Sequence, residues 1–171
     1  MPTTNETTTH RLVLPADANH YGTLYAGSLL KYALEAAYAA ATRSVGLKAN
    51  LMLRRVLSME CRRTVPVGSL VEIRGTVLQV RQCHLVVGVV GMPLSPGDLP
   101  WMDGLLGFVQ VDARGLPAEF PTDVAATPVT PFWTPLLNRL AKTKTRGASA
   151  EWLSAGFGEQ SSSPPVEIVS D

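Results

Sequence analysis

The sequence lacks several features that mark particular classes of protein. It has only two cysteines, Cys61 and Cys83, in no metal-type spacing, which excludes a disulfide framework and a cysteine zinc site. No apolar run reaches the roughly 18 residues that a membrane span needs. The N-terminal stretch MPTTNETTTH contains no apolar signal segment. We therefore expect a cytoplasmic protein with free thiols and no membrane contact.

Motifs for several kinds of chemistry are also absent. The chain contains no G-x-S-x-G elbow, no phosphate-loop lysine and no zinc-type spacing. Serine hydrolase, nucleotide hydrolase and metalloenzyme functions therefore have no support, and we expect neither a metal nor a cofactor.

Charge is scarce and unevenly placed. Only 17% of the residues are charged and the net charge is +1, which gives no general attraction to nucleic acid. So few charges favour a chain that hides part of its surface in a subunit interface. Between Arg43 and Arg81, however, eight basic residues accompany two acidic ones. This strip could hold a phosphate-bearing ligand or could equally be solvated strand edges, and the sequence leaves both open.

One long helix is predicted from Leu24 to about Val45, where the chain is rich in Ala and Leu and has no Pro. The polar side chains form a single stripe at helical spacing, and the rest of the surface is apolar. That stripe consists of Ser28, Lys31, Glu35 and Thr42. We expect this helix to be buried over most of its circumference and to end at Gly46.

Strand-like segments surround the helix. They cover residues 10–15, 51–65, 70–80, 84–90 and 105–111, separated by Pro- and Gly-containing turns. A long apolar helix needs a sheet to cover it, and an antiparallel meander can curl around it, so the predicted class is α+β. The expected organisation is a flexible N-terminus (1–8), one domain (9–121), an extension with a short helix at 132–142 (122–144) and a disordered tail (145–171).

Three motifs occur in the order and spacing of a known family. The first fits the pattern N-x-x-G-x-x-[FY]-G-G-x-L-L with one departure, Ala26. The others are the turn Val65-Pro66-Val67-Gly68 and a final strand with Asp112, Gly115 and Pro117. On these motifs residues 8–121 resemble the hot-dog fold thioesterases of the acyl-CoA type, the superfamily that includes the hydroxybenzoyl-CoA thioesterases. The resemblance implies a hot-dog fold, in which a curved antiparallel sheet wraps a central helix.

The same resemblance implies a function and an assembly. It implies an acyl-CoA or acyl-ACP substrate, hydrolysis of its thioester, and a homodimer or dimer of dimers with sites at the seam between subunits. The family places a carboxylate seven residues after the second glycine, where this chain has Leu34. The nearest acid, Glu35, is rotated from that position by about 100° around the helix.

Three residues are candidates for the chemistry. Gly27 opens the helix, where free N–H groups could polarise a thioester carbonyl, or it only lets the helix pack closely. Asn19 could orient the carbonyl or a water, or it could shape its loop. Glu35 could act as base, or it could pair with Lys31 four residues earlier.

Further residues are candidates for holding the substrate. They are Gly22, Tyr25, Ser28, Arg54 and Arg55. Two other functions stay open: a non-catalytic acyl-thioester-binding or regulatory domain, which Leu34 favours, and a dehydratase. A dehydratase would need a histidine beside an acid, and only His20 lies near the motif.

Overall fold

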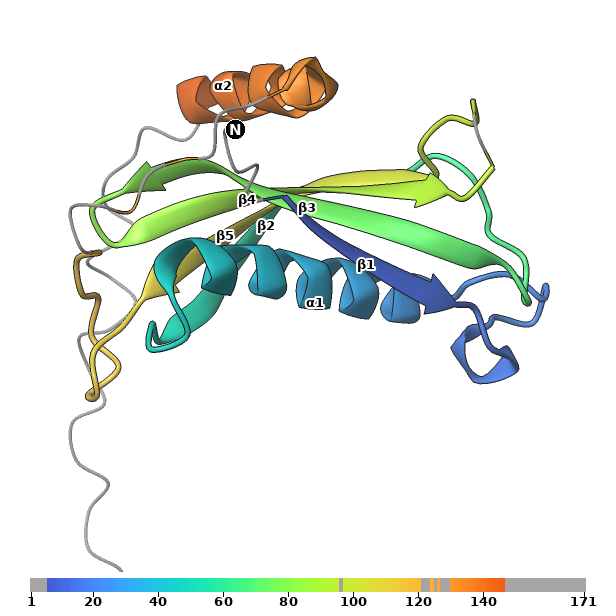
Figure 1. Ribbon diagram of the computed structural model, residues 1–171, viewed down its shortest axis with the longest axis horizontal. Helices are drawn as coiled ribbons and strands as arrows, with labels where there is room; N and C mark the ends of the chain where they lie inside the picture. The colour runs from blue at the N-terminus through green and yellow to red at the C-terminus, as the bar shows by residue number, and fades with distance from the viewer. Residues whose placement is uncertain (1–5, 96, 121–123, 125, 127–129, 147–171) are drawn as a thin grey trace, which may run out of the picture.

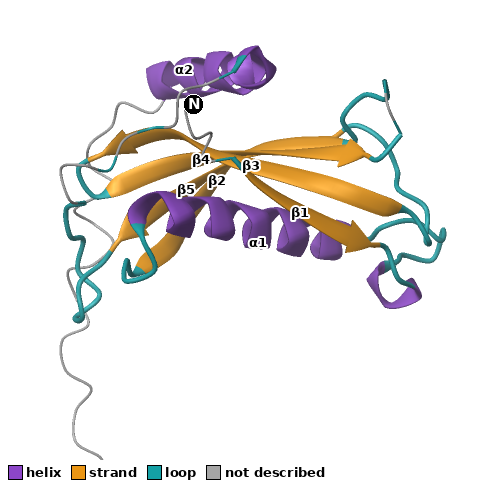
Figure 2. Cartoon of the chain, viewed as in Figure 1, coloured by secondary structure: helices purple, strands orange, loops and turns teal. Residues whose placement is uncertain are grey.

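A computed structural model describes residues 6–95, 97–120, 124, 126 and 130–146 of the chain. One antiparallel sheet of five strands, in the order β1-β3-β4-β5-β2, has a helix on each face (Figures 1 and 2). The elements are β1 (Thr7–Leu12), η1 (Pro15–Asp17), α1 (Ala26–Val45), β2 (Leu51–Cys61), β3 (Leu70–Arg81), β4 (His84–Pro93), β5 (Met102–Gln110), η2 (Pro131–Trp133) and α2 (Thr134–Arg146). The predicted α+β class, with one long helix against a curved antiparallel sheet, is confirmed.

Alanines let α1 lie close against the sheet. The buried stripe of the helix includes Ala33, Ala36 and Ala40, all fully buried. A Cβ added at Gly75 of β3 would lie 3.1 Å from the Ala36 carbonyl oxygen and 3.2 Å from the Ala40 Cβ. The small residues on both sides therefore set the separation of helix and sheet. At its C-terminus α1 ends on Gly46, whose φ of +92° suits glycine.

The helix starts two residues later than predicted. The backbone N–H of Leu24 donates to Val65 O and that of Tyr25 donates to Asp17 O, at 2.8 Å each. Both residues are held by neighbouring loops, so the helix begins at Ala26. The prediction that most of the circumference is buried is wrong for this single chain, because Leu30 and Tyr38 are exposed.

The first strand begins earlier than predicted. Residues 10–15 were the expected strand, whereas β1 pairs with β3 from Thr7↔Gly75 to Leu12↔Leu70. The flexible N-terminus predicted for residues 1–8 is therefore too long, since Thr7 and Thr8 belong to the sheet. The β-branched threonines suit a strand, and the free edge of β3 supplies their hydrogen-bond partners.

Three other strand boundaries differ from the prediction. β2 ends at Cys61 instead of residue 65, and β4 continues to Pro93. β5 begins at Met102, three residues before the expected start. The sequence Asp103-Gly104 is unfavourable for a strand, but Asp103 is buried and accepts hydrogen bonds from Arg62 and Arg139 at 2.5 Å each.

The short helix expected near residues 132–142 is α2, which covers the face of the sheet opposite α1 (Figure 1). It packs through Leu136 and Leu140 against apolar side chains of β3, β4 and β5. Arg139 of α2 also pairs with Asp103 and Glu60. The disordered tail was predicted for residues 145–171; residues 145 and 146 belong to α2, and the remainder lies outside the described residues.

Over the described ranges, no helix combines the length and the apolar character that a membrane crossing demands.

Candidate functional site

The N-terminus of α1 carries backbone N–H groups with no side-chain cap. Tyr25 is the N-cap residue and makes no side-chain capping hydrogen bond. The first turn has no acidic residue, so no carboxylate competes for the positive end of the helix dipole. The first N–H groups of a helix have no partner within the helix. Gly27 is exposed in this turn and Ser28 is half-buried. The helix start can therefore donate to an incoming oxygen.

The Tyr25 ring lies directly over Gly27. A Cβ added at Gly27 would lie 2.5 Å from Cε1 of Tyr25. The ring is 57% exposed, so it can move away from the glycine without disturbing the core. A larger residue at position 27 would displace this exposed ring, so packing in the single chain does not by itself require glycine here.

Asn19 shapes the loop before the helix. Its side-chain oxygen accepts hydrogen bonds from the backbone N–H groups of Tyr21 at 2.9 Å and Thr23 at 3.2 Å. Its amide nitrogen donates to the Thr23 hydroxyl at 3.0 Å. Gly22, at φ +72°, lets the chain turn between these two partners. The loop-shaping alternative for Asn19 is thus observed, and one amide N–H stays available for a further contact.

Glu35 forms an ion pair with Arg11 of β1. The pairing with Lys31, which was one alternative from the sequence, is not the one observed. Both side chains are about two-fifths exposed. The Arg11 guanidinium also lies over the Tyr32 ring, 5.4 Å from its centroid. Burial, together with a hydrogen bond to the Asp17 carboxylate, raises the pKa of Tyr32 to about 12. Arg11 is therefore the residue that fixes the Glu35 carboxylate.

A groove of about 390 Å³ runs beside Glu35. Its walls are almost wholly apolar and come from α1, β2 and β5. They are Leu34, Glu35, Tyr38, Ala39, Leu53 and Phe108. Leu34 stands where the family pattern has a carboxylate, so the groove offers an apolar wall at that point. Such a groove suits a hydrocarbon chain or the apolar surface of a partner.

The candidate site is split within one chain. Gly27 and Glu35 are eight residues apart, which corresponds to about 12 Å along the helix axis. A carbonyl and a water between donor and base need a separation nearer about 8 Å. Leu24, just before α1, donates its backbone N–H to Val65 O. The opposite, C-terminal end of α1 leads through Asn50 to β2.

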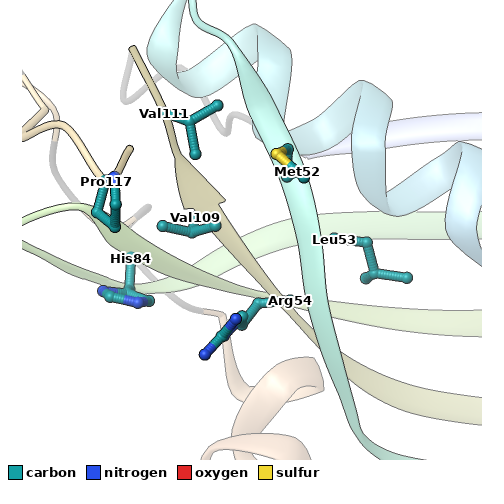
Figure 3. A pocket seen from close by; sticks show the side chains of 7 residues that line it. All are labelled: Met52, Leu53, Arg54, His84, Val109, Val111 and Pro117. Atoms are coloured by element: carbon teal, nitrogen blue, oxygen red, sulfur yellow. The ribbon is translucent and has the colours of Figure 1, made fainter. Parts of the chain in front are cut away.

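The two candidate arginines lie at that second end, on β2. Arg54 lines a pocket of about 110 Å³ together with His84, Val109 and Pro117 (Figure 3). The positive charge of Arg55 also contributes to lowering the pKa of His84. The structure therefore does not bring Arg54 and Arg55 together with Gly27 in the same chain.

Two residues of the site were missed from the sequence. Arg11 and Tyr38 contribute to the surroundings of Glu35, and neither belongs to the helix motif. The alternation of Thr7, Thr9 and Arg11 on one face of β1 was the available signal for Arg11. His20 is exposed, with its ring centroid 3.9 Å from that of Tyr21. Within the described part of the chain, no group of His, Cys, Asp and Glu could hold a metal ion.

Comparison with known proteins finds one family that is similar to part of the chain. Residues 21–94, which include α1 and the part of the helix motif from Gly22 onward, match the family model described as the thioesterase superfamily. No curated protein sequence matches the chain.

Solved structures share the fold. A hexameric acyl-CoA thioesterase is 26% identical, with a TM-score of 0.69, over 86% of this chain and 96% of that one. The acyl-CoA hydrolase of Staphylococcus aureus, in complex with butyryl coenzyme A, coenzyme A and coenzyme A disulfide, is 19% identical with a TM-score of 0.71, over 85% of each chain. The acyl-CoA hydrolase from Bacillus cereus is 18% identical with a TM-score of 0.69, over 85% of this chain and 87% of that one. The chain has the hot-dog fold of these structures, and its residues 21–94 are similar to the thioesterase superfamily.

Proposed function

We propose that the protein hydrolyses acyl-CoA thioesters at a site formed between two copies of the chain. One observation carries the proposal: the N-terminus of α1 has no side-chain cap and no acid in its first turn, and Gly27 is exposed there, in a segment that matches the thioesterase superfamily. The structural relatives described as acyl-CoA hydrolases and thioesterases support coenzyme A as the thiol carrier.

The helix N-terminus provides the electrostatic part of the reaction. The thioester carbonyl oxygen accepts the N–H of Gly27, and the helix dipole stabilises the negative charge that develops as water attacks. The Tyr25 ring moves off Gly27 to admit the carbonyl. Coenzyme A leaves as a thiolate, which needs little help from an acid. The remaining requirement is a base for the attacking water.

Glu35 is the base in this proposal. Arg11 holds its carboxylate at the rim of the apolar groove, and the remaining carboxylate oxygen accepts a proton from water. Because about 12 Å separates it from Gly27 along its own helix, Glu35 serves the Gly27 of another copy. A two-fold dimer with antiparallel α1 helices brings Gly27 of one protomer toward Glu35 of the partner subunit.

The same arrangement unites the split site. In an antiparallel dimer the β2 end of one protomer approaches the α1 N-terminus of the other. Arg54 and Arg55 then supply positive charge for the phosphates of coenzyme A, while the acyl chain enters the groove beside Leu34. Exposed Leu30, Tyr38 and Leu53 provide the apolar surface for such a dimer.

A second candidate function is a non-catalytic acyl-thioester-binding domain. Leu34 at the family carboxylate position favours it. The ion pair between Arg11 and the Glu35 carboxylate favours it as well. This candidate keeps the groove and the helix N-terminus but has no base.

Glu35→Gln separates the two candidates. The change keeps size and hydrogen bonding, so hydrolysis of short, medium, long and aryl acyl-CoA should fall by about 100-fold in an enzyme. Glu119→Gln removes an exposed carboxylate after β5 and serves as the control with unchanged rate. The binding-domain function follows instead if wild type hydrolyses none of these substrates while calorimetry detects acyl-CoA binding that Glu35→Gln leaves unchanged.

A further inference from the structure

Cys83 and His84 form a thiol–imidazole pair that the proposed hydrolysis does not use. Cys83 is the second residue of the two-residue turn between β3 and β4. Its Sγ lies 3.1 Å from Nδ1 of His84, and both residues are partly buried. A sulfur and a ring nitrogen at this distance can share a proton. The pair lies at the end of the sheet where β2 begins.

The turn that carries the thiol is held from both sides. The Gln82 carbonyl accepts the N–H of Phe120 at 2.9 Å, and the Cys83 carbonyl accepts that of Gln110 at 2.8 Å. Gln82 itself adopts a φ of +41°, a left-handed conformation that non-glycine residues rarely take. These contacts hold the backbone of the turn that carries the thiol.

Two arginines, Arg54 and Arg55, place positive charge near His84 of the pair. Arg54 and His84 line the same pocket of about 110 Å³, and Figure 3 shows both side chains beside Val109. Burial, followed by the charges of Arg54 and Arg55, lowers the pKa of His84. A lowered pKa favours the neutral imidazole, whose Nδ1 can accept the thiol proton in the Nε2–H tautomer. Reactive cysteines typically lie in cationic, partly exposed surroundings of this kind.

We propose that Cys83 is a thiol-exchange site for anionic, low-molecular-weight disulfides. The Cys83 sulfur attacks one sulfur of the disulfide, and a bond forms between them as the bond between the two ligand sulfurs breaks. The departing sulfur leaves as a thiol, with the proton that Cys83 gave up through His84. The Cys83 sulfur is oxidised and the departing sulfur is reduced, so no other reactant is needed. Arg54 attracts the anionic ligand to the pocket.

Cys61 of the same chain cannot resolve the mixed disulfide. Cys61 pairs with Met102 at the start of β5, whereas the neighbour of Cys83, His84, pairs with Val109 near its end. Seven strand residues separate these positions, or about 23 Å. A disulfide needs Cα atoms within about 7 Å. The modification therefore stays on Cys83 until an external thiol removes it.

The exposed Cys61 provides an internal control for reactivity. The full-length protein is treated at neutral pH with dithiobis(nitrobenzoate), a disulfide with two carboxylates, or with neutral dithiodipyridine. Peptide mass spectrometry at short times gives the rate at each cysteine in the wild type. Absorbance then follows Cys83 alone in Cys61→Ser and Cys61 alone in Cys83→Ser, as an independent measure of the two rates. His84→Gln and Arg54→Gln are made in the Cys61→Ser background.

Cys83 is expected to react about tenfold faster than Cys61 with the dianionic reagent, although Cys61 is the more exposed thiol. His84→Gln should slow Cys83 about tenfold with both reagents, because it removes the proton acceptor. Arg54→Gln should slow the dianionic reagent more than the neutral one. A faster Cys61 with both reagents overturns the proposal, as does a His84→Gln protein that keeps its thermal transition and its Cys83 rate. The site does not depend on hydrolysis, so its failure leaves the proposed function unaffected.

Discussion

Asn19 illustrates how one side chain can have a structural role and still be available to a substrate. Its oxygen accepts the N–H groups of Tyr21 and Thr23, and its nitrogen donates to Thr23. We predict that Asn19→Ala lowers the free energy of unfolding by about 1–2 kcal/mol and turnover about tenfold, because the loop before α1 loses these bonds. Asn19→Asp keeps both acceptor bonds, removes the amide donor and adds a negative charge. A rate loss in Asn19→Asp without a change in Tm would place this side chain beside the substrate; full activity would leave it a loop residue.

A separate prediction concerns how the free energy of unfolding depends on pH through His84. Burial and the charges of Arg54 and Arg55 lower its pKa from the usual 6.5. As the pH falls through about 6.5, the unfolded chain therefore binds more protons than the folded chain, and the free energy of unfolding decreases. Urea unfolding at about pH 7.5 and about pH 5.5 should show a larger loss for the wild type than for His84→Gln, which has no proton to gain. An equal loss in both proteins would contradict this assignment.

Among the elements, α2 depends on a polar clamp as well as on apolar packing. Arg139 donates to Asp103 at 2.5 Å, and Arg62 donates to the other carboxylate oxygen. We predict that Arg139→Met lowers the free energy of unfolding by about 1–3 kcal/mol, because Asp103 stays buried with only Arg62 beside it. Asn138→Ala, at an exposed position of the same helix, is the control and should change little. Equal stability of the two variants would mean that α2 is held by Leu136 and Leu140 alone.

The elements also show how far the sequence alone could go. The helix and its motif were predictable because the pattern is local: spacing at helical period and a glycine at each end define α1. The start of β5 was not, because Asp103 is buried in a strand only with the arginine that follows β2 and one from α2 beside it. The Arg11–Glu35 pair was missed for the same reason, since it joins residues 24 positions apart through the register of β1 on β3. Long-range pairing decided what local propensity could not.

For the molecule as a whole, the open apolar side of α1 and β2 predicts that the working unit is a dimer. Leu30, Tyr38 and Leu53 are 45%, 44% and 41% exposed in the single chain. In the proposed shared site, their burial against a second copy also brings Gly27 within reach of a base, so assembly and activity should be lost together. Sedimentation at micromolar concentration should give twice the chain mass of 18.3 kDa. Leu53→Glu places a charge on this surface and should weaken association by about 100-fold.

The dimer and the activity can be separated from simple misfolding by a matched substitution. Leu99→Glu introduces the same charge at an exposed leucine in the loop between β4 and β5. It should leave both the mass and the turnover of acyl-CoA unchanged, whereas Leu53→Glu should lose both while keeping a cooperative thermal transition. Because the monomer holds Gly27 and Glu35 about 12 Å apart along one helix, its proposed base does not lie beside its proposed oxyanion donor. A Leu53→Glu monomer with wild-type turnover would therefore contradict the shared site and leave the chemistry to a single chain.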